Sequence, residues 1–217
     1  MNEIKNILFP IIILIILSSC TNSPSNDTSN SDTIDTSRTL PVDSIVCTPD
    51  STVSDLEMTL KPQEQNFWCW AACAEMVMEH LSDTDTITQC VEANKQFGRE
   101  DCCSSPTSDS CDRPGWPQFE KYGYDADTTF DEALSWEDVK KQIDCKKSPF
   151  CVTWKWDEGG GHMMVASAYK KIDEDSLVKI YDPLPVGTGT PQWVRYSEYV
   201  SGPGYTHWDD FFNIKKR

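Results

Sequence analysis

The sequence predicts an α+β domain with a helical first half and an antiparallel sheet in the second half. Residues 70–81 place apolar side chains such as Ala72 and Met76 at a helical spacing. After Pro149 the pattern changes, and residues 150–156 alternate as a β-strand does. Helices followed by strands in this order are typical of α+β folds.

The other elements follow from local signals. Gly98 ends the second helix, and Ser135 with Asp138 forms a capping signature that opens the last one. Residues 100–114 form a loop rich in Cys, Ser and Asp, which we expect disulfides to order. The expected helices are residues 70–81, 88–97, 116–122 and 135–143. The expected strands are residues 150–156, 162–169, 177–181 and 192–196, before a helical turn at 197–200.

The N-terminus predicts an exported lipoprotein. Residues 7–17 are an apolar run that fits a signal peptide and is too short to span a bilayer, which needs roughly 20 residues. The following Leu17-Ser18-Ser19-Cys20 resembles the bacterial lipoprotein box, which implies a signal peptide at 1–19 and acylation of Cys20. We therefore expect an exported protein, anchored by lipid to the bacterial cell envelope, in the periplasm or at the cell surface.

A polar linker separates this signal from the domain. Fifteen of the 35 residues from 21 to 55 are Ser or Thr, and no aromatic residue lies between 21 and 66. Such a segment cannot bury enough apolar surface to offset the entropy of ordering it. We assign residues 20–58 to a disordered tether and residues 59–217 to the folded domain.

The formal net charge of −16 makes nucleic acid an unsuitable partner, because an acidic surface repels phosphates and no basic stripe is present. The ten cysteines of an exported chain indicate an oxidising compartment. We expect a monomer that uses no cofactor and no metal. A metal site is the rival interpretation of the cysteines, but no second close pair completes a tetrahedral set. Eight cysteines are disulfide candidates, with connectivity left open: Cys47, Cys73, Cys90, Cys102, Cys103, Cys111, Cys145 and Cys151.

Cys69 is the candidate nucleophile, because it falls where an irregular segment enters a helix. Backbone N–H groups and the helix dipole favour a thiolate there. Among the three histidines, His162 follows three glycines at the start of an expected strand. Asp182 lies 20 residues later, where the next antiparallel strand can bring its carboxylate behind the imidazole.

These segments resemble the papain-like cysteine peptidases. The run from Gln63 through Cys69-Trp70-Ala71 is similar to their active-site segment. The segments around His162 and Asp182 are similar to those of compact bacterial branches, which include effector proteases and peptidases that cleave bacteriocin leaders. The resemblance implies a papain-like fold, with the active site between the helical half and the sheet.

The resemblance also implies residue roles in the hydrolysis of a protein or peptide substrate. Cys69 would attack the scissile carbonyl, His162 would be base and then acid, and Asp182 would orient the imidazole. Gln63 would join the Cys69 N–H in the oxyanion hole, with Gln65 as a competing candidate. His162 follows Cys69 by 93 residues, fewer than the roughly 130–150 of plant papains, so substrate preference is not carried over.

Two other functions are also compatible with the sequence. Trp68-Cys69 is similar to the start of thioredoxin-like sites, so thiol–disulfide exchange through Cys69 and Cys73 is an alternative, although the spacing is one residue too long. The other alternative is a catalytically silent binding module that keeps the papain-like fold.

Overall fold

The computed structural model describes residues 47–49 and 52–217 of the chain. The expected signal peptide, Cys20 and most of the expected tether lie outside these residues and stay predictions. Among the described residues, no helix is both long enough and apolar enough to cross a membrane.

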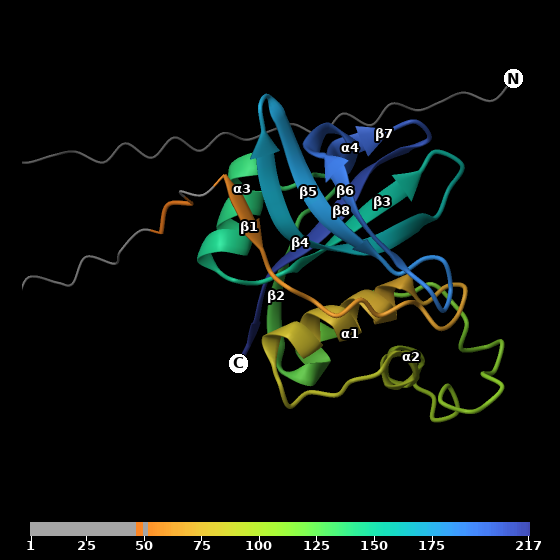
Figure 1. The fold of residues 1–217 in the computed structure, drawn as a ribbon. Coiled ribbons are helices and arrows are strands. Elements are labelled where there is room, and N and C mark those ends of the chain that lie inside the picture. Colours follow the sequence, from red (N-terminus) through yellow and green to blue (C-terminus); the bar gives the residue numbers. More distant parts are fainter. Residues whose placement is uncertain (1–46, 50–51) are drawn as a thin grey trace, which may run out of the picture. The chain divides into compact units, whose positions relative to one another are not determined.

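Six helical segments surround the sheet (Figure 1). They are α1 (Cys69–Leu81), α2 (Gln89–Phe97), η1 (Phe119–Tyr122), α3 (Trp136–Lys140), η2 (Lys141–Cys145) and α4 (Tyr196–Val200). Ser135 caps α3 as expected, since its hydroxyl accepts a hydrogen bond from the Asp138 N–H at 3.2 Å. Gly98 ends α2 in the left-handed conformation. The expected helices therefore all exist, with the third reduced to a short 3₁₀ turn.

One antiparallel sheet contains all the strands of the described residues. They are β1 (Val53–Asp55), β2 (Tyr124–Thr128), β3 (Phe150–Trp156), β4 (Gly161–Ile172), β5 (Asp175–Asp182), β6 (Thr190–Arg195), β7 (Ser201–Gly202) and β8 (Tyr205–Lys216). The main order is β2-β8-β3-β4-β5-β6, while β1 pairs with β4 and β7 with β8. The helices and the antiparallel sheet together confirm the α+β class.

Helices cover both faces of the sheet, and β4 shows this most clearly. Met163 and Val165 belong to the core beneath α1 and α2, whereas Met164 and Ala166 belong to the core shared with α3, η2 and α4. Because both faces of β4 are buried here, residues 163–166 are continuously apolar instead of alternating. The helices of the first half, α1 and α2, therefore pack on one face of β4, and α3, η2 and α4 pack on the other.

The domain begins earlier than we expected. Residues 52–58 were assigned to the tether, but Val53–Asp55 pairs with β4 through Ala168–Lys170, and the Leu56 N–H donates to the Ser167 carbonyl at 3.0 Å. The polar composition of residues 52–58 does not indicate a strand. An edge strand can form its backbone hydrogen bonds without burying apolar side chains.

Three disulfides join six of the eight candidate cysteines. They are Cys47–Cys145, Cys90–Cys103 and Cys102–Cys111. The expectation that Cys73 and Cys151 are also paired is wrong, since both are free thiols. Each is fully buried in the core beneath α1, where a thiol packs as a small apolar group. Burial raises the pKa of both thiols well above the usual range.

Glu92 on α2 is an acid inside the core beneath α1, and its side chain is fully buried. Burial raises the pKa of its carboxyl to about 8, although the Gln118 backbone and Lys121 act in the opposite direction. The folded protein therefore holds a proton at neutral pH that the unfolded chain, with the ordinary pKa of 4.5, has released. The free energy of unfolding must fall as pH rises from 4.5 to about 8.

We expect Glu92→Gln to remove this pH dependence, because the amide is neutral at every pH. Near pH 5 the variant should unfold at almost the wild-type denaturant midpoint. Near pH 8.5 it should be more stable than wild type by on the order of 4 kcal/mol, since one pKa unit is worth about 1.4 kcal/mol. Urea denaturation across this range measures the effect, with the exposed Glu120→Gln as control. If the free energies of unfolding of wild type and Glu92→Gln change with pH in parallel, Glu92 is not a buried protonated carboxyl.

Candidate active site

Cys69 is the first residue of α1, and its thiol is half-buried. The residue before it, Trp68, occupies the N-cap position without a side-chain hydrogen bond to the helix. A Ser, Thr, Asp or Asn at this position would normally satisfy one of the first N–H groups. Helix α1 therefore begins at Cys69 without a side-chain capping bond from its N-cap residue. The positive end of the helix dipole lies at the Cys69 thiol.

Three glycines precede His162, two of them required by the backbone conformation and the third by a close contact. Gly159 and Gly160 form the β3–β4 turn with φ of 97° and 80°, in the left-handed region. A Cβ on Gly161 would lie 2.5 Å from the Trp154 carbonyl oxygen and 3.0 Å from the Trp208 ring. The tight hairpin fixes the start of β4, and with it the position of the imidazole.

The sheet register brings His162 and Asp182 together. β4 and β5 are antiparallel with Val165 opposite Tyr181, so the start of one strand lies beside the end of the other. His162 Nε2 is 2.7 Å from Asp182 Oδ1. The same oxygen accepts the Leu184 N–H at 2.8 Å, which fixes the carboxylate in the turn after β5. This pairing leaves His162 Nδ1 as the ring nitrogen free for another partner.

The side chain of Cys69 lies close enough to His162 to act on the pKa of its imidazole. Burial of the ring acts to lower its pKa, but the interactions with Asp182 and Cys69 outweigh burial and raise the pKa to about 9. An imidazole of this kind is protonated at neutral pH beside the thiol. Cys69 on α1 thus comes together with the His162–Asp182 pair on β4 and β5, although α1 is far from these two consecutive strands in sequence.

Gln63 is fully buried and holds the segment that leads into α1. Its Nε2 donates to the carbonyls of Gln65 at 2.7 Å and Asn66 at 2.8 Å. Its backbone N–H donates to the Pro183 carbonyl at 2.9 Å, next to Asp182. Gln63 therefore links the nucleophile segment to the turn that carries the acid. Because both of its amide hydrogens contact the loop, its oxyanion role stays a prediction. The competing Gln65 donates to the Thr107 hydroxyl at 3.1 Å.

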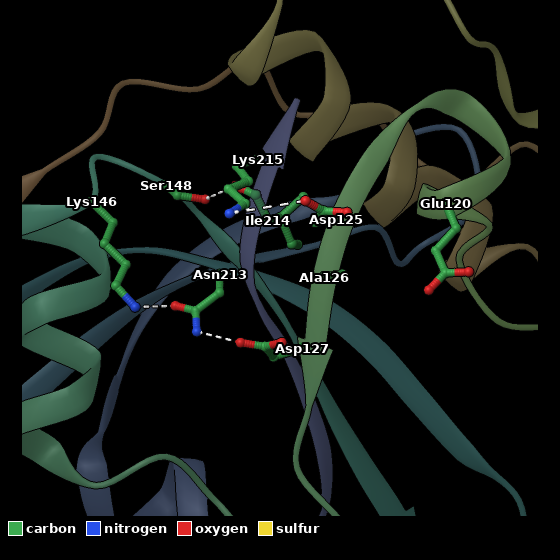
Figure 2. Close-up of a pocket in the computed structure, with 9 residues that line it drawn as sticks. All are labelled: Glu120, Asp125, Ala126, Asp127, Lys146, Ser148, Asn213, Ile214 and Lys215. Carbon is green, nitrogen blue, oxygen red and sulfur yellow. Dashed lines mark hydrogen bonds and ion pairs between the residues drawn. The ribbon is translucent and has the colours of Figure 1, made fainter. Parts of the chain in front are cut away.

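A cavity of about 680 Å³ lies elsewhere, between β2, β8 and the turn after η2 (Figure 2). None of its lining residues belongs to the set around Cys69. Figure 2 shows that charged and polar side chains already pair across it, with Asn213 between Lys146 and Asp127. Lys215 lies 3.9 Å from Asp125. We assign no function to this cavity.

The described residues contain one group of potential metal ligands, Asp101, Cys102 and Cys111. Cys102 and Cys111 form a disulfide and so offer no thiolate to a metal. Sequence reasoning missed another residue of this loop, Asp112. Its carboxylate accepts the Phe67 N–H at 2.8 Å, two residues before Cys69. Only its neighbour Cys111, a disulfide candidate, hinted that this part of the loop is fixed.

One family of known proteins matches most of the domain. None of the curated proteins matches the chain. The sequence profile described as the Peptidase_C39 like family matches residues 56–205, which include Cys69, His162 and Asp182. This match covers well over half of the chain, so the chain belongs to the Peptidase_C39-like family and is related to the papain-like cysteine peptidases.

Proposed function

We propose that the protein hydrolyses peptide bonds with Cys69 as nucleophile, His162 as base and acid, and Asp182 as the group that orients the imidazole. The single observation that carries the proposal is the His162–Asp182 contact of 2.7 Å, in a ring whose pKa is also raised by the nearby Cys69 side chain. Family membership supports a cysteine peptidase with protein or peptide substrates.

The proposed reaction has two halves. The Cys69 thiolate attacks the scissile carbonyl, and the Cys69 backbone N–H at the open end of α1 donates to the developing oxyanion. His162 Nδ1 gives its proton to the leaving amine, which departs and leaves a thioester on Cys69. His162 then takes a proton from water, and the hydroxide attacks the thioester. The acid product leaves as the Cys69 thiolate re-forms beside the protonated His162. Gln63 joins the oxyanion hole if one Nε2–H turns from its loop carbonyl to the substrate.

Thiol–disulfide exchange is the weaker candidate. It requires Cys73 as the second thiol, yet Cys73 is fully buried and its pKa is raised by that burial. A poorly ionised, inaccessible thiol cannot easily attack a mixed disulfide at Cys69. Disulfide exchange also requires no imidazole–carboxylate pair, so it does not explain the contact between His162 and Asp182.

Labelling with a peptidyl epoxide directed at papain-type thiols tests the proposal. We expect the folded protein to take up one equivalent, located on Cys69 by peptide mapping, because Cys73 and Cys151 are buried with raised pKa values. Labelling should disappear after Cys69→Ala and persist after Cys73→Ala. A folded wild-type protein that does not react would favour the catalytically silent binding module.

We also propose that the protein acts outside the cytoplasm, attached to the envelope through Cys20. The three disulfides support an oxidising compartment. Metabolic labelling with a palmitate analogue, compared between wild type and Cys20→Ala, tests the lipid anchor.

A further inference from the structure

The short segment 111–113 contacts the residues immediately before the nucleophile. Asp112 Oδ1 accepts the Phe67 N–H at 2.8 Å, and Asp112 Oδ2 accepts a bond from Asn66 Nδ2 at 3.1 Å. These residues are more than 40 positions apart in sequence. One carboxylate therefore fixes both the backbone and a side chain of the turn that delivers Cys69.

Two indole groups extend this contact on either side of the nucleophile. Trp68 Nε1 donates to the Cys111 carbonyl at 2.7 Å, and Trp70 Nε1 donates to the Arg113 carbonyl at 3.2 Å. Both indoles are buried. A Cβ on Gly115 would lie 2.7 Å from the Trp70 ring, so the chain after this segment also packs closely on α1. The residues on both sides of Cys69 are thus held by the same loop.

The loop needs disulfides to act as a support. It has no regular secondary structure between α2 and η1. Cys102–Cys111 closes it on itself, and Cys90–Cys103 ties it to α2. The Cys102 N–H also donates to Asn94 Oδ1 of α2 at 2.9 Å. The position of Asp112 is therefore fixed relative to the helices instead of depending on the loop's own conformation.

Helix α1 has particular need of such a support, because its N-cap residue Trp68 supplies no side-chain capping bond. Asp112 supplies an acceptor from another part of the chain, one residue before the cap. A displacement of the order of 1 Å between reacting groups can cost about a hundredfold in rate. The direction in which Phe67-Trp68 enters the helix sets where the Cys69 thiol lies relative to His162.

We propose that Asp112 is a positioning residue for Cys69, acting through the Phe67 N–H from a loop locked by Cys102–Cys111. The inference rests on the proposed function, since it concerns the same nucleophile. Asp112 touches no reacting atom. It works as a hydrogen-bond acceptor of fixed position, and its charge is not what the site requires.

The test compares Asp112→Ala with Asp112→Asn in the full chain. The matched controls are Asp109→Ala and Asp109→Asn, which change an exposed acid of the same loop that makes no hydrogen bond or ion pair to any described residue. For each variant we would measure kcat and KM on a peptide substrate, the thermal midpoint, and the rate of Cys69 alkylation by iodoacetamide. Alkylation reports on the thiol even if no peptide is cleaved.

We expect Asp112→Ala to lower kcat about tenfold to a hundredfold with KM nearly unchanged, and to slow alkylation severalfold. Asp112→Asn should recover most of both rates, because its carbonyl oxygen still accepts the Phe67 N–H while Asn66 turns its amide. The Asp109 variants should match wild type in both readouts.

Three results would overturn the positioning role. They are rates for Asp112→Ala equal to those of the Asp109 variants, a loss that only follows the unfolded fraction at the assay temperature, or an Asp112→Asn variant as slow as Asp112→Ala. If wild type alkylates at Cys69 but cleaves no substrate, the peptidase proposal fails. The alkylation rates of the Asp112 variants then still decide the positioning role.

Discussion

Replacing Cys69 with alanine is expected to abolish peptide hydrolysis, with a loss of at least about ten-thousand-fold in kcat/KM. Without the sulfur no thioester can form, and His162 and Asp182 have no nucleophile to activate. The alanine should leave the fold intact, because the thiol is only half-buried at the start of α1 and belongs to no disulfide. Release of fluorescent peptide from a protein substrate measures the loss.

Cys73→Ala is the matched control, since it removes a thiol one helical turn away on the same helix. We expect it to retain hydrolysis, with some loss of stability because Cys73 is fully buried. If instead both variants lose activity equally, and the wild type reduces a test disulfide, the pair Cys69 and Cys73 would be acting in disulfide exchange. Undiminished hydrolysis by Cys69→Ala would remove Cys69 from the mechanism.

Replacing Asp182 with asparagine should lower kcat/KM about tenfold to a hundredfold and shift its pH profile. In wild type we expect activity to decline on the alkaline side around the His162 pKa of about 9, because the imidazolium must protonate the leaving amine. The amide oxygen of the new side chain can still accept from Nε2, so orientation is partly kept. The lost carboxylate charge no longer raises the His162 pKa, so the alkaline limb must move to lower pH.

The pH dependence of kcat/KM from about pH 5 to pH 10 checks this second prediction. Asp173→Asn makes the same chemical change in the exposed β4–β5 turn and should leave the profile unchanged. Asp182→Ala should be slower than Asp182→Asn, because it removes the acceptor altogether. An alkaline limb that stays in place after Asp182→Asn would show that Asp182 does not set the protonation of His162.

The sequence predicted the parts of the fold that local pattern decides. The helix at 70–81 and the strands at 150–156 and 162–169 come from apolar spacing, and the structure confirms them with small changes at their ends. It did not predict β8, whose Tyr205–Lys216 carries Asp209 and Asp210 among aromatic residues. Asp210 is fully buried, and besides His207 on the same strand its partners are the Leu134 N–H and the Tyr199 hydroxyl, which lie outside β8. No local pattern could reveal such partners.

The site was predictable to the extent that each residue sits at a recognisable local position. Cys69 at a helix start, His162 after three glycines and Asp182 at a strand end could each be found from their neighbours. The role of Asp112 could not, because it depends on a contact across more than 40 residues and on two disulfides whose pairing the sequence left open. The same reasoning explains why Cys73 and Cys151, which the structure shows as free thiols, stood among the disulfide candidates. Counting cysteines cannot distinguish a bridge from a buried thiol.

The place of β8 in the sheet has a consequence for how the molecule is made. β8 lies between β2 and β3, so the middle of the sheet is completed by the segment synthesised after every other described strand. A ribosome that has released only residues up to about 200 has produced Cys69, His162 and Asp182, yet β3 still lacks its neighbour on one side. The chain therefore contains Cys69, His162 and Asp182 before the sheet that supports them can be completed by β8. The proposed peptidase activity should therefore appear only once β8 has joined the sheet.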